Sequence, residues 1–276
     1  MLNQDRFYGK VNLNKQIAVN LAVLEELDLN LELCITDSSF LFGEFDVYYP
    51  LLQQYLSKKG SKVNMHLPFY GLQLGCKDPY IRKLSHRLIM QGLRRAADLG
   101  IRKAVMHVSF PPQIPIKGRE HWLDQFCFNL EKILSYCRLQ GITLLIENTY
   151  ESSTTIFSDI FSRFPEEELA MCLDVGHVYC FSKSSIEEWW NSFREKIKII
   201  HLSDNSADDD SHLALGDGSI DFPELFRLTA PGFFSFNGQN KNETNLTENE
   251  ITYTLETEVS CFKRSLLYLE RIFTAQ

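Results

Sequence analysis

The 276-residue sequence lacks several features that would assign it directly to a functional class. No apolar run approaches the roughly 20 residues that a membrane-spanning helix needs, and the first residues contain no apolar core of a signal peptide. We therefore expect a cytoplasmic protein with no membrane partner. The seven cysteines include no C-x-x-C pair and are odd in number, which argues against a zinc ribbon and against a complete disulfide framework.

Basic residues are also scarce. The 28 Lys and Arg residues stand against 36 Asp and Glu, and the formal net charge is -8. This balance gives no electrostatic footprint for a phosphate backbone, although a local basic groove is compatible with an acidic total. The sequence also has no G-x-x-x-x-G-K-[ST] loop and no dinucleotide fingerprint, so we expect no nucleotide cofactor.

Short apolar runs alternate with longer amphipathic segments along the whole chain. The amphipathic segments include 15–27, 80–99, 119–139 and 185–196, where Ser185 and Glu188 suggest a capping box. Repeated strand–helix units without a break in composition predict a single (β/α)₈ TIM barrel domain over residues 1–276. The eight predicted strands are 6–13, 31–36, 62–67, 103–109, 142–147, 169–174, 197–202 and 251–256.

Two segments interrupt this rhythm. The segment 111–118 is too rich in proline for a helix and predicts a structured loop near the mouth of the barrel. The polar, Asn-rich segment 231–250 predicts a mobile connection before the last strand.

Residue types that bind metals stand at the ends of the predicted strands, and the carboxyl ends of barrel strands converge on one mouth. His177 follows one of these ends, Asp210 and His212 follow another, and the remaining histidines, His86 and His121, fall on predicted helices. A mixture of Asp, Glu and His without cysteine suits a catalytic Zn²⁺, Mn²⁺ or Co²⁺ ion. The six strand-end residues are His66, His107, Glu147, Asp174, His201 and Glu256.

Each of these residues alone has an ordinary explanation. Asp174 could cap the following helix, Glu147 could pair with an arginine, and a histidine could be a hydrogen-bonded rim residue. Together they would bury several unpaired charges at one mouth unless a cation compensated them, which favours the metal site. Glu256 and Glu258 point to the same side of a strand, and we choose Glu256 because the apolar strand leads directly into it.

The motifs around these positions resemble the xylose-isomerase-like barrel superfamily, which contains sugar-phosphate isomerases and epimerases as well as endonuclease IV-type abasic-site nucleases. The resemblance covers about residues 60 to 260 and is specific for the superfamily rather than for one reaction. The motifs are MHLPFYGLQLG (65–75), VMHVS (105–109), LLIENT (144–149), LDVGH (173–177), HLSDN and DSHLALGDGSIDF (201–222) and TLE (254–256).

By resemblance to the epimerases, one divalent ion would be held by Glu147, Asp174, His201 and Glu256, and the two glutamates would exchange a proton with substrate carbon through an enediolate. His177 would then bind a substrate hydroxyl. By resemblance to the nucleases, these four residues and five further residues would together bind up to three zinc ions. The five are His66, His107, His177, Asp210 and His212.

The first predicted strand departs from the nuclease pattern, because RFYGKVNLNK lacks the glycine-rich opening with His and Ser that is typical of those enzymes. We therefore favour a metal-dependent isomerase or epimerase of a small sugar or sugar phosphate, with Glu147 and Glu256 as catalytic residues. A multi-zinc phosphoesterase or abasic-site nuclease, with nucleic acid as the partner, is the alternative. A third hypothesis is a metal-binding or sugar-sensing protein without catalytic activity. The LGDG turn at 215–218 could offer backbone N–H groups to a phosphate or be a plain turn before a helix near Phe222.

Overall fold

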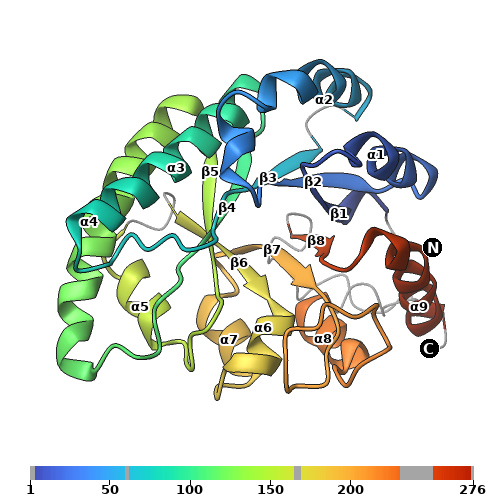
Figure 1. The fold of residues 1–276 in the computed structure, drawn as a ribbon. Helices are drawn as coiled ribbons and strands as arrows, with labels where there is room; N and C mark the ends of the chain where they lie inside the picture. The colour runs from blue at the N-terminus through green and yellow to red at the C-terminus, as the bar shows by residue number, and fades with distance from the viewer. Residues whose placement is uncertain (1–3, 60–61, 165–168, 231–250, 275–276) are drawn as a thin grey trace.

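Eight parallel strands, each paired with the next in chain order, close into a barrel because β8 pairs back onto β1 (Figure 1). The structure is a computed structural model and describes residues 4–59, 62–164, 169–230 and 251–274, so the predicted connection at 231–250 lies outside the described residues. The (β/α)₈ TIM barrel is confirmed, and each strand lies within two residues of its predicted bounds. The strands are β1 (Phe7–Asn12), β2 (Asn30–Cys34), β3 (Val63–His66), β4 (Lys103–His107), β5 (Thr143–Glu147), β6 (Leu169–Asp174), β7 (Ile197–Leu202) and β8 (Thr252–Leu255).

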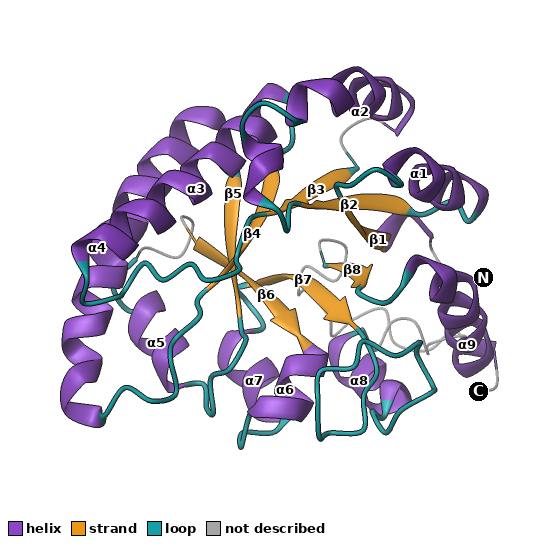
Figure 2. Ribbon diagram, viewed as in Figure 1, coloured by secondary structure: helices purple, strands orange, loops and turns teal. Residues whose placement is uncertain are grey.

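The helices form a ring outside the strands (Figure 2). Within the described residues, none of them is long and apolar enough to cross a membrane. The α-helices are α1 (Ile17–Glu26), α2 (Phe45–Lys59), α3 (Pro79–Asp98), α4 (Ile116–Gln140), α5 (Thr155–Phe161), α6 (Val175–Phe181), α7 (Ile186–Phe193), α8 (Phe222–Thr229) and α9 (Phe262–Thr274). The short 3₁₀ helices are η1 (Gln4–Arg6), η2 (Ser38–Leu41) and η4 (Val259–Cys261).

Two helix starts test the local predictions. The α7 helix begins as predicted, because the Ser185 side chain accepts a hydrogen bond from the Glu188 N–H at 3.1 Å. The proline-rich segment is a loop only as far as Pro115, and α4 then begins at Ile116, three residues before the predicted 119. Pro115 has φ -68° and ψ 156°, the extended backbone of a residue that precedes a helix, so the prolines end the loop rather than prevent the helix.

A large apolar core fills the space between the barrel and its helices. At Gly9 of β1 this packing is especially close, since a Cβ atom there would lie 2.6 Å from side-chain atoms of both Leu24 and Phe262. Those residues belong to α1 and α9, which flank β1 in Figure 1. Glycine therefore lets two helices pack against the first strand.

The inside of the barrel divides into an apolar and a polar side below the mouth. On the polar side Glu32 of β2 is fully buried and accepts a hydrogen bond from the Thr254 hydroxyl of β8 at 3.0 Å. The site residues at the mouth therefore have apolar neighbours beneath them on one side of the barrel and polar neighbours on the other. The apolar side consists of Val105, Leu145, Ala170, Cys172 and Ile199.

Candidate metal centre

The six strand-end residues meet at the carboxyl mouth of the barrel. Four of them are the last residues of their strands, one is the next-to-last residue of β7, and one directly follows β8. All are buried except His107, whose side chain is 12% exposed. In chain order they are His66, His107, Glu147, Asp174, His201 and Glu256.

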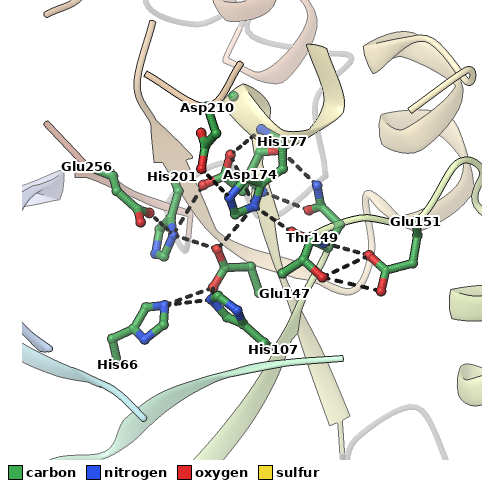
Figure 3. Close-up of polar contacts among 12 residues, drawn as sticks. His66, His107, Glu147, Thr149, Glu151, Asp174, His177, His201, Asp210 and Glu256 are labelled. Atoms are coloured by element: carbon green, nitrogen blue, oxygen red, sulfur yellow. Dashed lines mark hydrogen bonds and ion pairs between the residues drawn. The ribbon is translucent and has the colours of Figure 1, made fainter. Parts of the chain in front are cut away.

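A four-residue group with the donor set of a divalent metal site lies at the centre of the mouth (Figure 3). Ligand atoms of Glu147, Asp174, His201 and Glu256 all lie within 4.8 Å of one another. The Nδ1 atom of His201 is 2.6 Å from a Glu256 oxygen, 3.3 Å from a Glu147 oxygen and 3.7 Å from Asp174 Oδ2. Three carboxylates and one imidazole therefore converge on a single small volume.

The hydrogen bonding of Asp174 shows that this group fits a cation. Its Oδ1 atom accepts the His177 backbone N–H at 2.7 Å and so caps α6, while its Oδ2 atom is buried without a hydrogen bond. The Oε2 atom of Glu256 is also buried, and it lies 2.6 Å from His201 Nδ1 without hydrogen-bond geometry. Because buried anionic oxygens without partners are costly, and carboxylate with imidazole suits Zn²⁺, Mn²⁺ or Co²⁺, the residues fit a divalent ion. Asp174 thus caps α6 with one oxygen and leaves the other oxygen open toward the four-residue group.

Charge repulsion in the group is evident in its pKa values. The pKa of Asp174 is raised from 3.8 to about 7, because burial and the neighbouring carboxylates of Glu256 and Glu147 together outweigh the opposing effect of His177. Burial lowers the pKa of His201, but the surrounding Cys172, Glu32 and carboxylate ligands outweigh it and hold this pKa well above its ordinary value. In the metal-free chain a proton therefore supplies part of the positive charge that an ion would bring.

A second group shares Glu147 with the first. The Nε2 atoms of His66 and His107 lie 3.1 Å and 3.3 Å from Glu147 Oε2, while Glu147 Oε1 faces His201. Burial lowers the pKa of His107 to about 4 despite the attraction of Glu147, so this imidazole is neutral at pH 7, the form in which histidine binds metals. The Glu147 carboxylate is placed to bridge two ligand groups.

A third group stands on the rim. Asp210 Oδ2 lies 3.2 Å from His177 Nε2 and 3.0 Å from His212 Nε2. The contact between Asp210 and His212 agrees with their spacing of two residues in the sequence. The other ring nitrogen of His177 contacts the Asn148 carbonyl at 2.8 Å, and that of His212 contacts the Glu256 carbonyl at 2.6 Å. All nine residues predicted for the site thus gather at one mouth, whereas His86 and His121 lie on α3 and α4.

The loop that carries Asp210 and His212 is organised by Asp204. Its carboxylate accepts backbone N–H groups from Gly216 and Gly218 at 2.9 Å each and from Ile220 at 3.1 Å. The two glycine N–H groups of the LGDG turn are therefore bonded to a carboxylate, and those of Leu215 and Asp217 are bonded to the Ser265 hydroxyl and the Ala214 carbonyl. The plain turn is the correct interpretation rather than a phosphate cradle. At Gly218 a Cβ atom would lie 2.4 Å from the Asn205 carbonyl oxygen, so only glycine fits.

Sequence reasoning missed two charged residues of the site. Lys10 of β1 forms an ion pair with Glu256, and Glu32 of β2 lies 2.9 Å from His201. The sequence feature that could have identified them is a charged residue inside a predicted strand, at 6–13 for Lys10 and at 31–36 for Glu32. Glu258 is exposed, whereas Glu256 is 6% exposed and joins the ligand group.

A cavity of about 780 Å³ opens above the metal-ligand group, a size that suits a small molecule. Its wall carries several amide and hydroxyl side chains beside the aromatic rings of Phe69 and Tyr70, and Lys10 is the one Lys or Arg among the described residues that line it. Five of the predicted site residues also line the cavity, namely His107, His177, Asp210, His212 and Glu256. The amide and hydroxyl residues include Asn12, Thr36, Gln73, Ser109 and Thr149.

Comparison with known proteins gives one family and several relatives. The profile of a family described as "Xylose isomerase-like TIM barrel" matches residues 31–238. An uncharacterized protein of Methanocaldococcus jannaschii is 26% identical over 181 residues, which are 59% of this chain and 58% of the relative. A protein of Metamycoplasma arthritidis named "Probable endonuclease 4" is 28% identical over 177 residues, which are 53% of this chain and 61% of the relative. The chain thus spans about three fifths of the length of these two relatives.

Two solved structures resemble the chain over nearly its whole length. A Thermus thermophilus protein, TTHB071, soaked with zinc chloride has a TM-score of 0.78 at 24% identity, and the match covers 97% of each chain. A D-tagatose 3-epimerase-like protein has a TM-score of 0.74 at 18% identity and covers 98% of this chain and 97% of its own. At these identities the likeness concerns the fold.

Proposed function

The chain belongs to the xylose isomerase-like TIM barrel family, and from that membership and the mouth geometry we propose a divalent-metal-dependent isomerase or epimerase of a small sugar or sugar phosphate. The observation that carries this proposal is the buried group of Glu147, Asp174, His201 and Glu256. It lies beneath a cavity whose amide and hydroxyl lining suits a polyol. The proposed cofactor is a single Zn²⁺, Mn²⁺ or Co²⁺ ion.

The reaction would proceed by proton transfer through an enediolate of the substrate. A bound ion supplies polarisation of the carbonyl and the adjacent hydroxyl, which lowers the cost of removing the carbon-bound proton by several kcal/mol. Glu147 and Glu256 approach the group from β5 and β8, and one takes the proton while the other, or the same residue, returns it. His177 and His212 stand on the cavity wall, where they orient substrate hydroxyls.

A second candidate function is phosphoester hydrolysis with up to three ions. It is favoured by the position of Glu147 between two ligand groups and of Asp210 between His177 and His212, because closely spaced metals activate water and clamp a phosphate. The relative named as a probable endonuclease 4 is consistent with this chemistry. Nucleic acid is the less favoured partner, since Lys10 alone supplies a positive side chain to the described cavity wall.

Metal content separates the two functions. For protein purified without chelator, we expect inductively coupled plasma mass spectrometry to find close to one ion per chain, and this number should fall sharply in Glu256→Gln. The matched control Glu258→Gln changes an exposed glutamate two residues away and should keep the wild-type content. A content near three ions supports phosphoester hydrolysis, and a chain that takes up no ion contradicts both functions.

A further inference from the structure

Glu32 is a buried carboxylate that belongs to none of the three ligand groups. It lies in the middle of β2 with no exposed surface, below the mouth and inside the barrel. Its Oε2 atom accepts the Thr254 hydroxyl at 3.0 Å, and its Oε1 atom lies 2.9 Å from His201 Nε2. A charge in this position is costly unless it has a specific partner, so the contact with His201 calls for a physical explanation.

The two ring nitrogens of His201 face different surroundings. Nδ1 faces the carboxylate oxygens of Glu147, Asp174 and Glu256. Nε2 faces a different carboxylate, that of Glu32. Neither Nε2 nor Glu32 Oε1 has a hydrogen bond elsewhere in the described part of the chain.

Metal binding at Nδ1 then sets the tautomer. Nδ1 is the ring nitrogen on the side of the three carboxylates, so an ion held among them would take the Nδ1 lone pair and leave the ring proton on Nε2. The Glu32 Oε1 atom, 2.9 Å from Nε2, is placed to accept that N–H. Metal-binding histidines generally donate the other ring N–H to a carboxylate or carbonyl in this way, and the partner fixes the ring and raises its basicity.

We propose that Glu32 is a positioning residue of the metal site, which holds His201 in the Nε2–H tautomer and so presents Nδ1 to the ion. Thr254 fixes the Glu32 carboxylate from the far side, so the chain of contacts runs from β8 through β2 to β7. The inference rests on the proposed metal binding at His201 but not on the reaction that the site catalyses.

Metal affinity of Glu32→Gln tests this role directly. Competition with a chromophoric chelator should give Zn²⁺ and Co²⁺ affinities about 10 to 100-fold weaker than wild type, the usual effect of removing such an outer partner. Thr254→Val, which removes only the hydroxyl that holds Glu32, should weaken binding in the same direction by a smaller factor. The control Asn30→Ala alters the same strand at a buried side chain that bonds the Phe7 carbonyl and should bind like wild type.

The visible absorption of bound Co²⁺ gives a second readout that a purely structural role would not move. Its d–d bands should shift in Glu32→Gln and keep their wild-type positions in Asn30→Ala. Wild-type affinity and spectrum in folded Glu32→Gln would overturn the inference and leave the metal site standing. If Glu32→Gln does not fold, Thr254→Val decides, and unchanged affinity there overturns the inference. A wild-type chain that binds neither metal would refute this role together with the proposed function.

Discussion

Lys10 reaches from β1 into the metal-ligand group and forms an ion pair with Glu256. Burial by itself lowers the pKa of this lysine, but Glu256 and other neighbouring groups outweigh it, so the pKa is raised and the ammonium stays charged. The same attraction helps to hold the pKa of Glu256 well below its ordinary value against the effect of burial. Lys10 thus stabilises the metal-free chain and also repels the ion for which Glu256 is a proposed ligand.

Lys10→Met should therefore change stability and metal affinity in opposite directions. Without chelated metal, we expect the free energy of unfolding to fall by about 3 kcal/mol, because a buried carboxylate loses its partner. Affinity for Zn²⁺ should rise by roughly tenfold or more, since like charges a few Å apart interact by about 4 kcal/mol at an effective dielectric constant of 20. Urea denaturation of chelator-treated protein and competition titration measure the two quantities.

The matched control is Lys62→Met, which removes a lysine that pairs with Asp5 and whose side chain is 43% exposed. Its effect on unfolding should stay within about 1 kcal/mol and its metal affinity should not change. A Lys10→Met protein with wild-type metal affinity would show that Lys10 does not compete with the ion.

At the scale of elements, the β7–α8 loop shows what the sequence could and could not predict. The sequence places Asp210 and His212 together because they are two residues apart, and it places both after β7 because the apolar run ends there. It does not reveal that Asp204 accepts the N–H groups of Gly216, Gly218 and Ile220, since those contacts span up to 16 residues. Strand positions were predictable from local apolar periodicity, whereas loop conformation depends on such non-local bonds.

Asp204→Ala should loosen this loop without dissolving the barrel. Three backbone N–H groups would lose a charged acceptor, so we expect a loss of about 1–3 kcal/mol in unfolding free energy and faster hydrogen exchange over residues 205–220. Asp208→Ala removes an exposed carboxylate of the same loop and serves as the control, with exchange close to wild type. Equal exchange in the two variants would contradict the role given to Asp204.

At the scale of the whole molecule, closure of the barrel brings together residues that are far apart in the sequence. Periodicity and the strand ends predicted that His66, Glu147 and His201 would approach one another, because parallel strands of a closed barrel share one mouth. The apolar periodicity did not predict that Lys10 and Glu32 point into the barrel. A charged residue in a strand is expected to face solvent, and only the register of the closed barrel shows otherwise. Part of the net charge of -8 is the carboxylate set at this mouth, which a cation would neutralise.

Proton exchange between a sugar and the solvent reports on the proposed enediolate chemistry itself. Metal-loaded protein is incubated in D₂O with a panel of aldoses, ketoses and their phosphates, and deuterium at the carbon beside the carbonyl is measured by NMR. We predict incorporation into at least one sugar, its loss on chelation, and a decrease of at least about 100-fold in Glu147→Gln. Glu131→Gln, at an exposed position of α4, should exchange like wild type. A Glu147→Gln protein that exchanges at the wild-type rate, or a metal-loaded wild type that labels no sugar, would contradict the account.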